Sequence, residues 1–292
     1  MRVGAGAHAA VRNVVRMSLV VVDCSDDEAH ANDDARTRAT FDEALPKIVL
    51  LRPDLAVGVT GDDPHRVIEA LASLRDASID DLLAHLVSQT SASFVVAALK
   101  PARLWMVSDG RVDERTTEVH RAWAGDRTAF NHFQARFHDW PDDTDVPFRL
   151  LSSMQWLTSF EAVESVGGYS VRVATVDGGF EFVADWSFVG PWMLEAAMSV
   201  SDSGASLRAT VPAGGDATTH RIVLLPGADP TRGALGLLIP EASVGLIFPH
   251  EQPWEPLRVA STSPGELAGL AWERHQQVLK VPEVPAQIWL PL

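Results

Sequence analysis

The residues with the clearest potential for chemistry lie in Lys47–Asp62, which reads KIVLLRPDLAVGVTGD. Lys47 opens an apolar run, a turn at Arg52-Pro53-Asp54 interrupts it, and a second apolar run leads to Gly61. Apolar runs this short, bounded by turn residues, predict two buried strands, and a helical pattern begins at Pro64. A strand that ends at a glycine and leads into a helix places free backbone N–H groups beside a pocket. The alternative interpretation is an ordinary corner between a strand and a helix.

The histidines and the single cysteine form no comparable pattern. The sequence has no zinc-type spacing of Cys and His, no P-loop and no GxGxxG motif, and its ten histidines are scattered. We therefore predict no metal site and no cofactor. His120, His132 and His138 lie near Asp126 and Asp139, but no spacing defines a base or a ligand among them. Ordinary surface or core histidines are the favoured interpretation.

Composition restricts the class of protein. The chain has 292 residues, 46% hydrophobic and 22% charged, which is typical of a globular protein with one large or two small domains. Its net charge of −15 argues against nucleic-acid and acidic-membrane partners. The single cysteine, Cys24, excludes an intrachain disulfide framework and fits a reducing cytoplasm. No apolar run approaches the roughly 18–20 residues of a membrane span. We predict a cytoplasmic protein that binds neither nucleic acid nor membrane.

Residues 1–16 differ in composition from the rest, because they are small or basic and contain no acid. A secretory signal would need a continuous apolar core of about 7–15 residues, which this stretch lacks. A mis-assigned start, with translation beginning at Met17, is the favoured alternative. We therefore treat residues 1–17 as a leader or a mis-annotated start and leave them out of the fold.

Hydrophobic periodicity predicts the elements that position the candidate residues. About four short strands come first, two helices follow, and then strands, two more helices and a final set of strands with one late helix. The predicted strands are Ser18–Cys24, Glu28–Arg36, Ile48–Leu51, Leu55–Val59, Phe94–Leu99, Arg103–Val107, Glu118–Trp123, Tyr169–Val176, Phe180–Trp186, Leu207–Val211, Arg221–Leu225, Leu235–Ile239 and Val244–Phe248. The predicted helices are His65–Arg75, Ile79–Gln89, Arg127–Phe137, Val146–Glu164 and Pro264–Val278.

This order of elements predicts an α+β protein, a four-layer α/β/β/α sandwich with a β-rich C-terminal extension. Two sheets would pack face to face between outer helices. A doubly wound α/β fold fits less well, because the strands come in hairpin pairs rather than alternating singly with helices.

Several short motifs occur in an order that resembles the N-terminal-nucleophile (Ntn) hydrolases of the proteasome β-subunit type, including their bacterial proteasome-like relatives. The resemblance covers Ser18 to Trp186. The motifs are Ser18-Leu19-Val20-Val21-Val22, Asp34-Ala35-Arg36, Lys47-Ile48, Val59-Thr60-Gly61-Asp62, Ser108-Asp109-Gly110 and Val166-Gly167-Gly168. The resemblance implies an Ntn-hydrolase-like domain at residues 18–200, with residues 201–292 as an extension that packs on the same domain.

The resemblance also implies a mechanism and a set of site residues. The nucleophile would be the hydroxyl of Ser18, with the α-amino group of the same residue as its base. Removal of Met17 would free that amine. Lys47 would lower the hydroxyl pKa by its charge, Asp34 would hold Lys47, and the Gly61 N–H would stabilise the oxyanion. The substrate would be a peptide or a small amide, and the protein would be a homo-oligomer.

Other motifs depart from the family and keep two alternatives open. Serine replaces the usual threonine at position 18, Val163 and Val166 occupy positions that are commonly polar, and Ala124-Gly125-Asp126 replaces a serine-rich motif. The first alternative is a non-catalytic binding or assembly protein that keeps the fold. The second is an unrelated enzyme built from two sheets.

Overall fold

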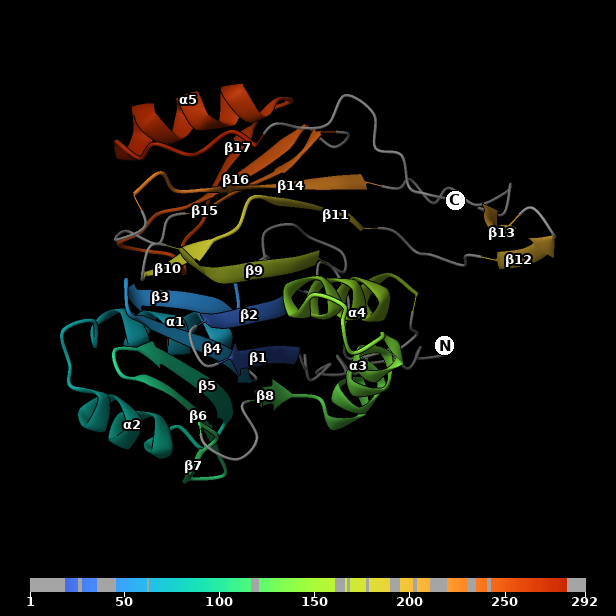
Figure 1. Cartoon of the computed structure of the whole chain (residues 1–292). Coiled ribbons are helices and arrows are strands. Elements are labelled where there is room, and N and C mark those ends of the chain that lie inside the picture. Colours follow the sequence, from blue (N-terminus) through green and yellow to red (C-terminus); the bar gives the residue numbers. More distant parts are fainter. Residues whose placement is uncertain are drawn as a thin grey trace, which may run out of the picture.

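The computed structural model describes residues 19–25, 28–35, 46–61, 63–116, 121–160, 166, 169–176, 179–189, 195–201, 204–210, 220–229, 235–240 and 243–282. Within these ranges the chain is an α+β protein with antiparallel sheets and five helices (Figure 1). No helix in the described ranges is long and apolar enough to cross a membrane.

Three five-stranded sheets and one separate hairpin contain the strands. Sheet A has the order β10-β9-β2-β1-β8, and sheet B has the order β3-β4-β5-β6-β7. Sheet C has the order β11-β14-β15-β16-β17, and β12 pairs only with β13 in the ladders described. The bounds are β1 Leu19–Ser25, β2 Glu28–Ala35, β3 Ile48–Arg52, β4 Leu55–Gly61, β5 Ala92–Leu99, β6 Ala102–Ser108, β7 Arg111–Glu114, β8 Arg121–Gly125, β9 Tyr169–Val176, β10 Gly179–Phe182, β11 Asp185–Val189, β12 Glu195–Ser201, β13 Gly204–Thr210, β14 His220–Pro226, β15 Leu235–Ile239, β16 Val244–Phe248 and β17 Leu257–Ala260.

The helices begin where the sequence provides caps. The bounds are α1 Pro64–Ala72, α2 Ile79–Ser88, α3 Arg127–Asp139, α4 Val146–Phe160 and α5 Pro264–His275. Asp63, Ser78, Asp126 and Ser263 each accept a hydrogen bond from a backbone N–H in the first turn of the helix that follows. These starts agree with the predicted helices to within one residue, and the described α4 ends four residues before the predicted Glu164.

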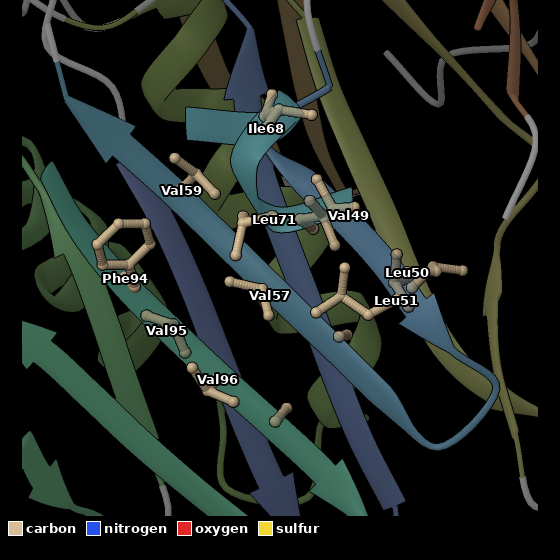
Figure 2. Close-up of a cluster of buried hydrophobic side chains, with 14 of the residues drawn as sticks. Val49, Leu50, Leu51, Val57, Val59, Ile68, Leu71, Phe94, Val95 and Val96 are labelled. Carbon is tan, nitrogen blue, oxygen red and sulfur yellow. The ribbon is translucent and has the colours of Figure 1, made fainter. Parts of the chain in front are cut away.

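Sheet B is covered on both faces, which explains its continuous apolar runs. From Leu55 to Thr60 every residue of β4 is buried. Helix α1 packs against β3 and β4, and β1 and β8 of sheet A also contact β4. A strand without a solvent face has no reason to alternate apolar with polar residues. Figure 2 shows Leu71 of α1 next to Val57 of β4, with Ile68 further along the same helix.

Sheet A and sheet B share one apolar core. The contacts join β1 to β4 and β5, β2 to β3 and β5, and β8 to β4, β5 and β6. Helix α2 contacts β6 and β7, whereas α4 contacts β2 and β9 and packs against α3. A second cluster of buried side chains, including Phe130, Phe133 and Met154, lies between α3 and α4.

Sheet C alternates its side chains between two cores. Leu224, Leu237 and Leu246 belong to the core shared with sheets A and B, whereas the next residue in each strand, Leu225, Leu238 and Ile247, packs with α5. In Figure 1, α5 covers the far face of sheet C, and β10 and β3 lie on the opposite side. Sheet C includes β11, which precedes residue 201. The domain boundaries at residues 200 and 201 stay a prediction.

One predicted strand is wrong. Phe180–Trp186 divides into β10 in sheet A and β11 in sheet C, with Val183 and Ala184 between them. The period-2 pattern continues across this join, so the sequence could not indicate the change of sheet. The sequence also did not predict β7, β12 or β17.

Candidate functional site

Lys47 and Gly61 lie at the same end of sheet B. Ile48 opens β3 and pairs with Gly58 of β4, and the Val59 N–H donates a hydrogen bond to the Lys47 carbonyl oxygen at 2.7 Å. Gly61, two residues further along, ends β4. The hairpin turn that joins β3 to β4 therefore brings two of the predicted site residues close together.

The Lys47 side chain is buried, with an exposed fraction of 8%. Lysine is almost never buried without a partner, because desolvation of an ammonium is costly. Lys47 does interact with another group. Its neighbours Ile48, Val49 and Leu50 are buried hydrophobic residues, so hydrophobic packing alone does not require a cation at this position.

Gly61 occupies a position that excludes a side chain. A Cβ at Gly61 would lie 2.8 Å from the Ser91 carbonyl oxygen and 3.0 Å from the Ala92 Cα. Gly61 pairs with Ala92, so the glycine allows the backbones of β4 and β5 to approach closely. Asp63 then caps α1 by accepting a hydrogen bond from the Arg66 N–H at 3.2 Å. The close approach of β4 and β5 explains why residue 61 is a glycine. It is compatible with the predicted role of the Gly61 N–H in binding an oxyanion.

Asp34 lies near the end of β2, where it pairs with Ser170 of β9. Val20 of β1 pairs with Asp33, so the start of β1 lies beside the end of β2. Ser18, the predicted nucleophile, lies outside the described residues; β1 begins at Leu19. Leu19, the residue after Ser18, therefore lies on the same part of sheet A as Asp34.

The turn after β8 also reaches the start of β1. Leu19 pairs with Gly125, which has a φ of 114°, a conformation that favours glycine. Asp126 follows and caps α3, with its Oδ1 2.9 Å from the Ala129 nitrogen. The segment Ala124-Gly125-Asp126 therefore ends β8 and caps the helix that follows.

Strand β2, which carries Asp34, contacts β3, which directly follows Lys47. This contact joins the part of the candidate site on sheet A to the part on sheet B. In Figure 2 the dark blue strands of sheet A cross behind β3, β4 and β5. The structure places Lys47 and Gly61 at one end of sheet B. It packs β2, the strand that carries Asp34, against β3.

The histidines do not form a second site among the described residues. His132 and His138 are exposed on α3, and His120 lies outside the described ranges. The described residues contain no cluster of three or more His, Cys, Asp or Glu side chains that could hold a metal ion.

A small recess that the sequence did not indicate lies where β3, β10 and sheet C meet. Its apolar wall is lined by Ile48, Leu50, Phe182, Leu235 and Phe248. Arg75 and His250 also line it, and an Arg75 Nη1 to His250 Nδ1 contact of 3.1 Å joins them. Burial lowers the pKa of the Arg75 guanidinium, and the nearby carboxylates of Glu251 and Asp76 oppose that shift. No short-range pattern could have found a pair separated by 175 positions.

Comparison with known proteins places the chain in no family. No protein-family model matches it, and no curated protein matches it.

Proposed function

We propose that this chain is a proteasome-like Ntn hydrolase that cleaves a peptide or another amide bond with Ser18 as its nucleophile. The observation that carries this proposal is the buried Lys47 ammonium at the end of sheet B, beside the glycine that ends β4. A buried cation that packing does not require is a candidate for work on a reacting group.

The arrangement of helices and sheets supports the proposal. Helices α1 and α2 contact sheet B, sheet B contacts sheet A, and α4 contacts sheet A with α3 beside it. We infer a four-layer α/β/β/α sandwich, as the family resemblance implies, with sheet C and α5 as its extension.

In the proposed reaction the Ser18 Oγ attacks the acyl carbon while the α-amino group of Ser18 accepts the hydroxyl proton. An α-amine, with a pKa of about 7.7–8.0, suits this step at neutral pH better than a lysine at about 10.4. The same proton passes to the leaving amine nitrogen, and water then hydrolyses the acyl ester. Lys47 stabilises the developing alkoxide by charge, Asp34 holds Lys47, and the Gly61 N–H donates to the oxyanion.

One observation favours a second candidate function, a binding or assembly protein without catalysis. Val166 occupies a position that is commonly polar in the family, and it is buried at 4% exposure among the side chains of α3 and α4. A core residue there cannot assist a proton transfer. In this second case, copies of the chain would assemble into a dimer or ring through their helices.

Turnover of amide substrates by Ser18→Ala tests the first proposal against the second. The matched control is Ser25→Ala, at the opposite end of β1. The first proposal expects hydrolysis by the control at the native rate and none by Ser18→Ala. Equal turnover by both variants would exclude Ser18 as the nucleophile, and a native protein without turnover on any amide would favour the second proposal.

A further inference from the structure

The residues of β8 show how the two faces of sheet A differ. Ala122 and Ala124 are buried in the core that sheets A and B share. Trp123, between them, instead stacks on Phe130 of α3, with the ring centroids 4.4 Å apart. Successive residues of a strand occupy opposite faces. One face of sheet A therefore meets sheet B, and the other meets α3 and α4.

The register of β2 assigns its two adjacent aspartates to different faces. Asp33 pairs with Val20 of β1 and with Val171 of β9, and Val171 is fully buried in the core shared with sheet B. Asp34 pairs with Ser170, the next residue of β9. Residues directly opposite one another in antiparallel strands share a face. Asp33 therefore takes a position on the face toward sheet B, and Asp34 takes one on the face toward α4.

Lys47, directly before β3 of the opposite sheet, is a buried cation that interacts with another group. A buried ammonium is retained where an anion compensates for its lost hydration. The elements that contact β3 most extensively are β4, α1, β10 and β2. Strand β4 has no acid, Glu69 of α1 is exposed, and Glu181 of β10 forms an ion pair with Lys280 at 2.8 Å. Among these elements, β2 is left as the source of a carboxylate.

We propose that Asp33, and not Asp34, is the carboxylate that pairs with Lys47 between sheets A and B. The family resemblance gives this role to Asp34, whereas the strand register gives it to Asp33. Glu28, the third acid of β2, lies five positions before Asp33, so strand alternation assigns it to the opposite face. The ion pair does not depend on catalysis. Its role in the reaction rests on the proposed function, in which Asp33 is a positioning residue that acts on Ser18 through Lys47.

A double-mutant cycle in urea unfolding of the full chain tests the pair. Asp33→Asn leaves the ammonium buried without its partner and should raise the equilibrium constant of unfolding about a hundredfold or more. Its combination with Lys47→Met should fall at least tenfold short of the product of the two single effects, because the charges are then lost together. The matched control is Asp34→Asn, whose effect should multiply with that of Lys47→Met to within about twofold. Coupling of Lys47 to Asp34 or to Asp62, or no coupling to Asp33, would overturn the proposal.

If Asp33→Asn does not fold, the native chain decides the matter. With Asp and Lys protonated in a deuterated background, NMR should detect a nuclear Overhauser contact between the Hε protons of Lys47 and the Hβ protons of Asp33. A contact with Asp34 in its place, or no contact with Asp33, would overturn the proposal without any substitution.

Turnover separates the ion pair from the proposed hydrolase. In a chain that hydrolyses amides, folded Asp33→Asn should lower kcat by a factor similar to that of Lys47→Met and change KM little, because Asp33 acts through Lys47. Asp33→Glu keeps the charge and should restore part of kcat. Native kcat in folded Asp33→Asn would refute the positioning role. Coupling of Asp33 to Lys47 in a chain without turnover would support the ion pair and refute the hydrolase proposal.

Discussion

Sheets B and C are both covered on two faces, but they bury different chemistry. All ten residues of β15 and β16 are buried, and each is apolar or glycine. Sheet B is equally apolar along β4 and β5, yet at one end it buries Lys47 and Thr60. The strands β15 and β16 show that central strands of this protein can be packed on both faces without buried polar side chains. The Thr60 hydroxyl donates to the Ser93 carbonyl oxygen at 3.4 Å, so the contrast supports the proposed role of Lys47 rather than one for the whole polar end.

The largest effect should come from the core that the two sheets share. Leu237 of β15 is fully buried in the cluster that includes β4 and β5. Leu237→Ala should lower the free energy of unfolding by about 2–5 kcal/mol. Urea unfolding followed by tryptophan fluorescence should show one transition shifted as a whole. The control, Val112→Ala at the exposed edge strand β7, should change the free energy of unfolding by less than about 0.5 kcal/mol. A separate early transition in Leu237→Ala, with the main transition unmoved, would contradict a shared core.

Lys47→Met tests the polar end of sheet B. The substitution keeps a long side chain but removes the ammonium, so amide turnover should fall about 10²–10³-fold, as when a charge-stabilising donor is removed. The control is Lys100→Met in the exposed turn between β5 and β6. It should leave turnover unchanged. Thermal midpoints of both variants establish that they fold, and native turnover in a folded Lys47→Met would contradict the proposed role of Lys47.

Gly61→Ala should destabilise the protein by about 1–3 kcal/mol, because the added Cβ meets backbone atoms of Ser91 and Ala92. Gly269→Ala is the matched glycine substitution in α5, where nothing lies within 4 Å of the added Cβ. It should stabilise the protein by about 0.5–1 kcal/mol, since alanine is the better helix former. Thermal unfolding measures both changes, and a Gly61→Ala variant as stable as the native chain would refute the close approach at Gly61.

The smallest effect is expected at the start of α5. The Thr262 N–H donates to Glu266 Oε2 at 2.9 Å, and this hydrogen bond is the main reason that the pKa of Glu266 is lowered. A lowered folded-state pKa contributes stability above the unfolded value of about 4.3, and that stability is lost as the pH falls through the folded value. The thermal midpoint of the native chain should exceed that of Glu266→Gln at pH 7 and should approach it in acid. A constant difference at all pH values would contradict this linkage.

The sequence predicted the β3–β4 hairpin and the helix starts because their signals are local. Apolar runs bounded by Arg52-Pro53-Asp54 and Gly61, and acids or serines before helical patterns, act over a few residues. The association of β11 with sheet C depends on contacts with β14, more than thirty positions away, and no local pattern records it.

The candidate site could be predicted only in part for the same reason. Lys47 and Gly61 could be identified together because the hairpin turn that lies between them in the sequence is short. Burial of Lys47 is a result of tertiary packing, which a single sequence cannot show. The recess depends on Arg75 and Phe248, from parts of the chain that meet only after sheet C docks.

The most direct test of the central claim is an intact-mass measurement with N-terminal sequencing of the protein expressed from its native upstream DNA. The proposed mechanism needs the α-amine of Ser18 to be free, so it predicts a mature chain that begins at Ser18. A mature chain that keeps residues 1–17 would hold the Ser18 nitrogen in a peptide bond, where it cannot act as a base. That result would contradict the hydrolase proposal and leave the fold as a scaffold for binding or assembly.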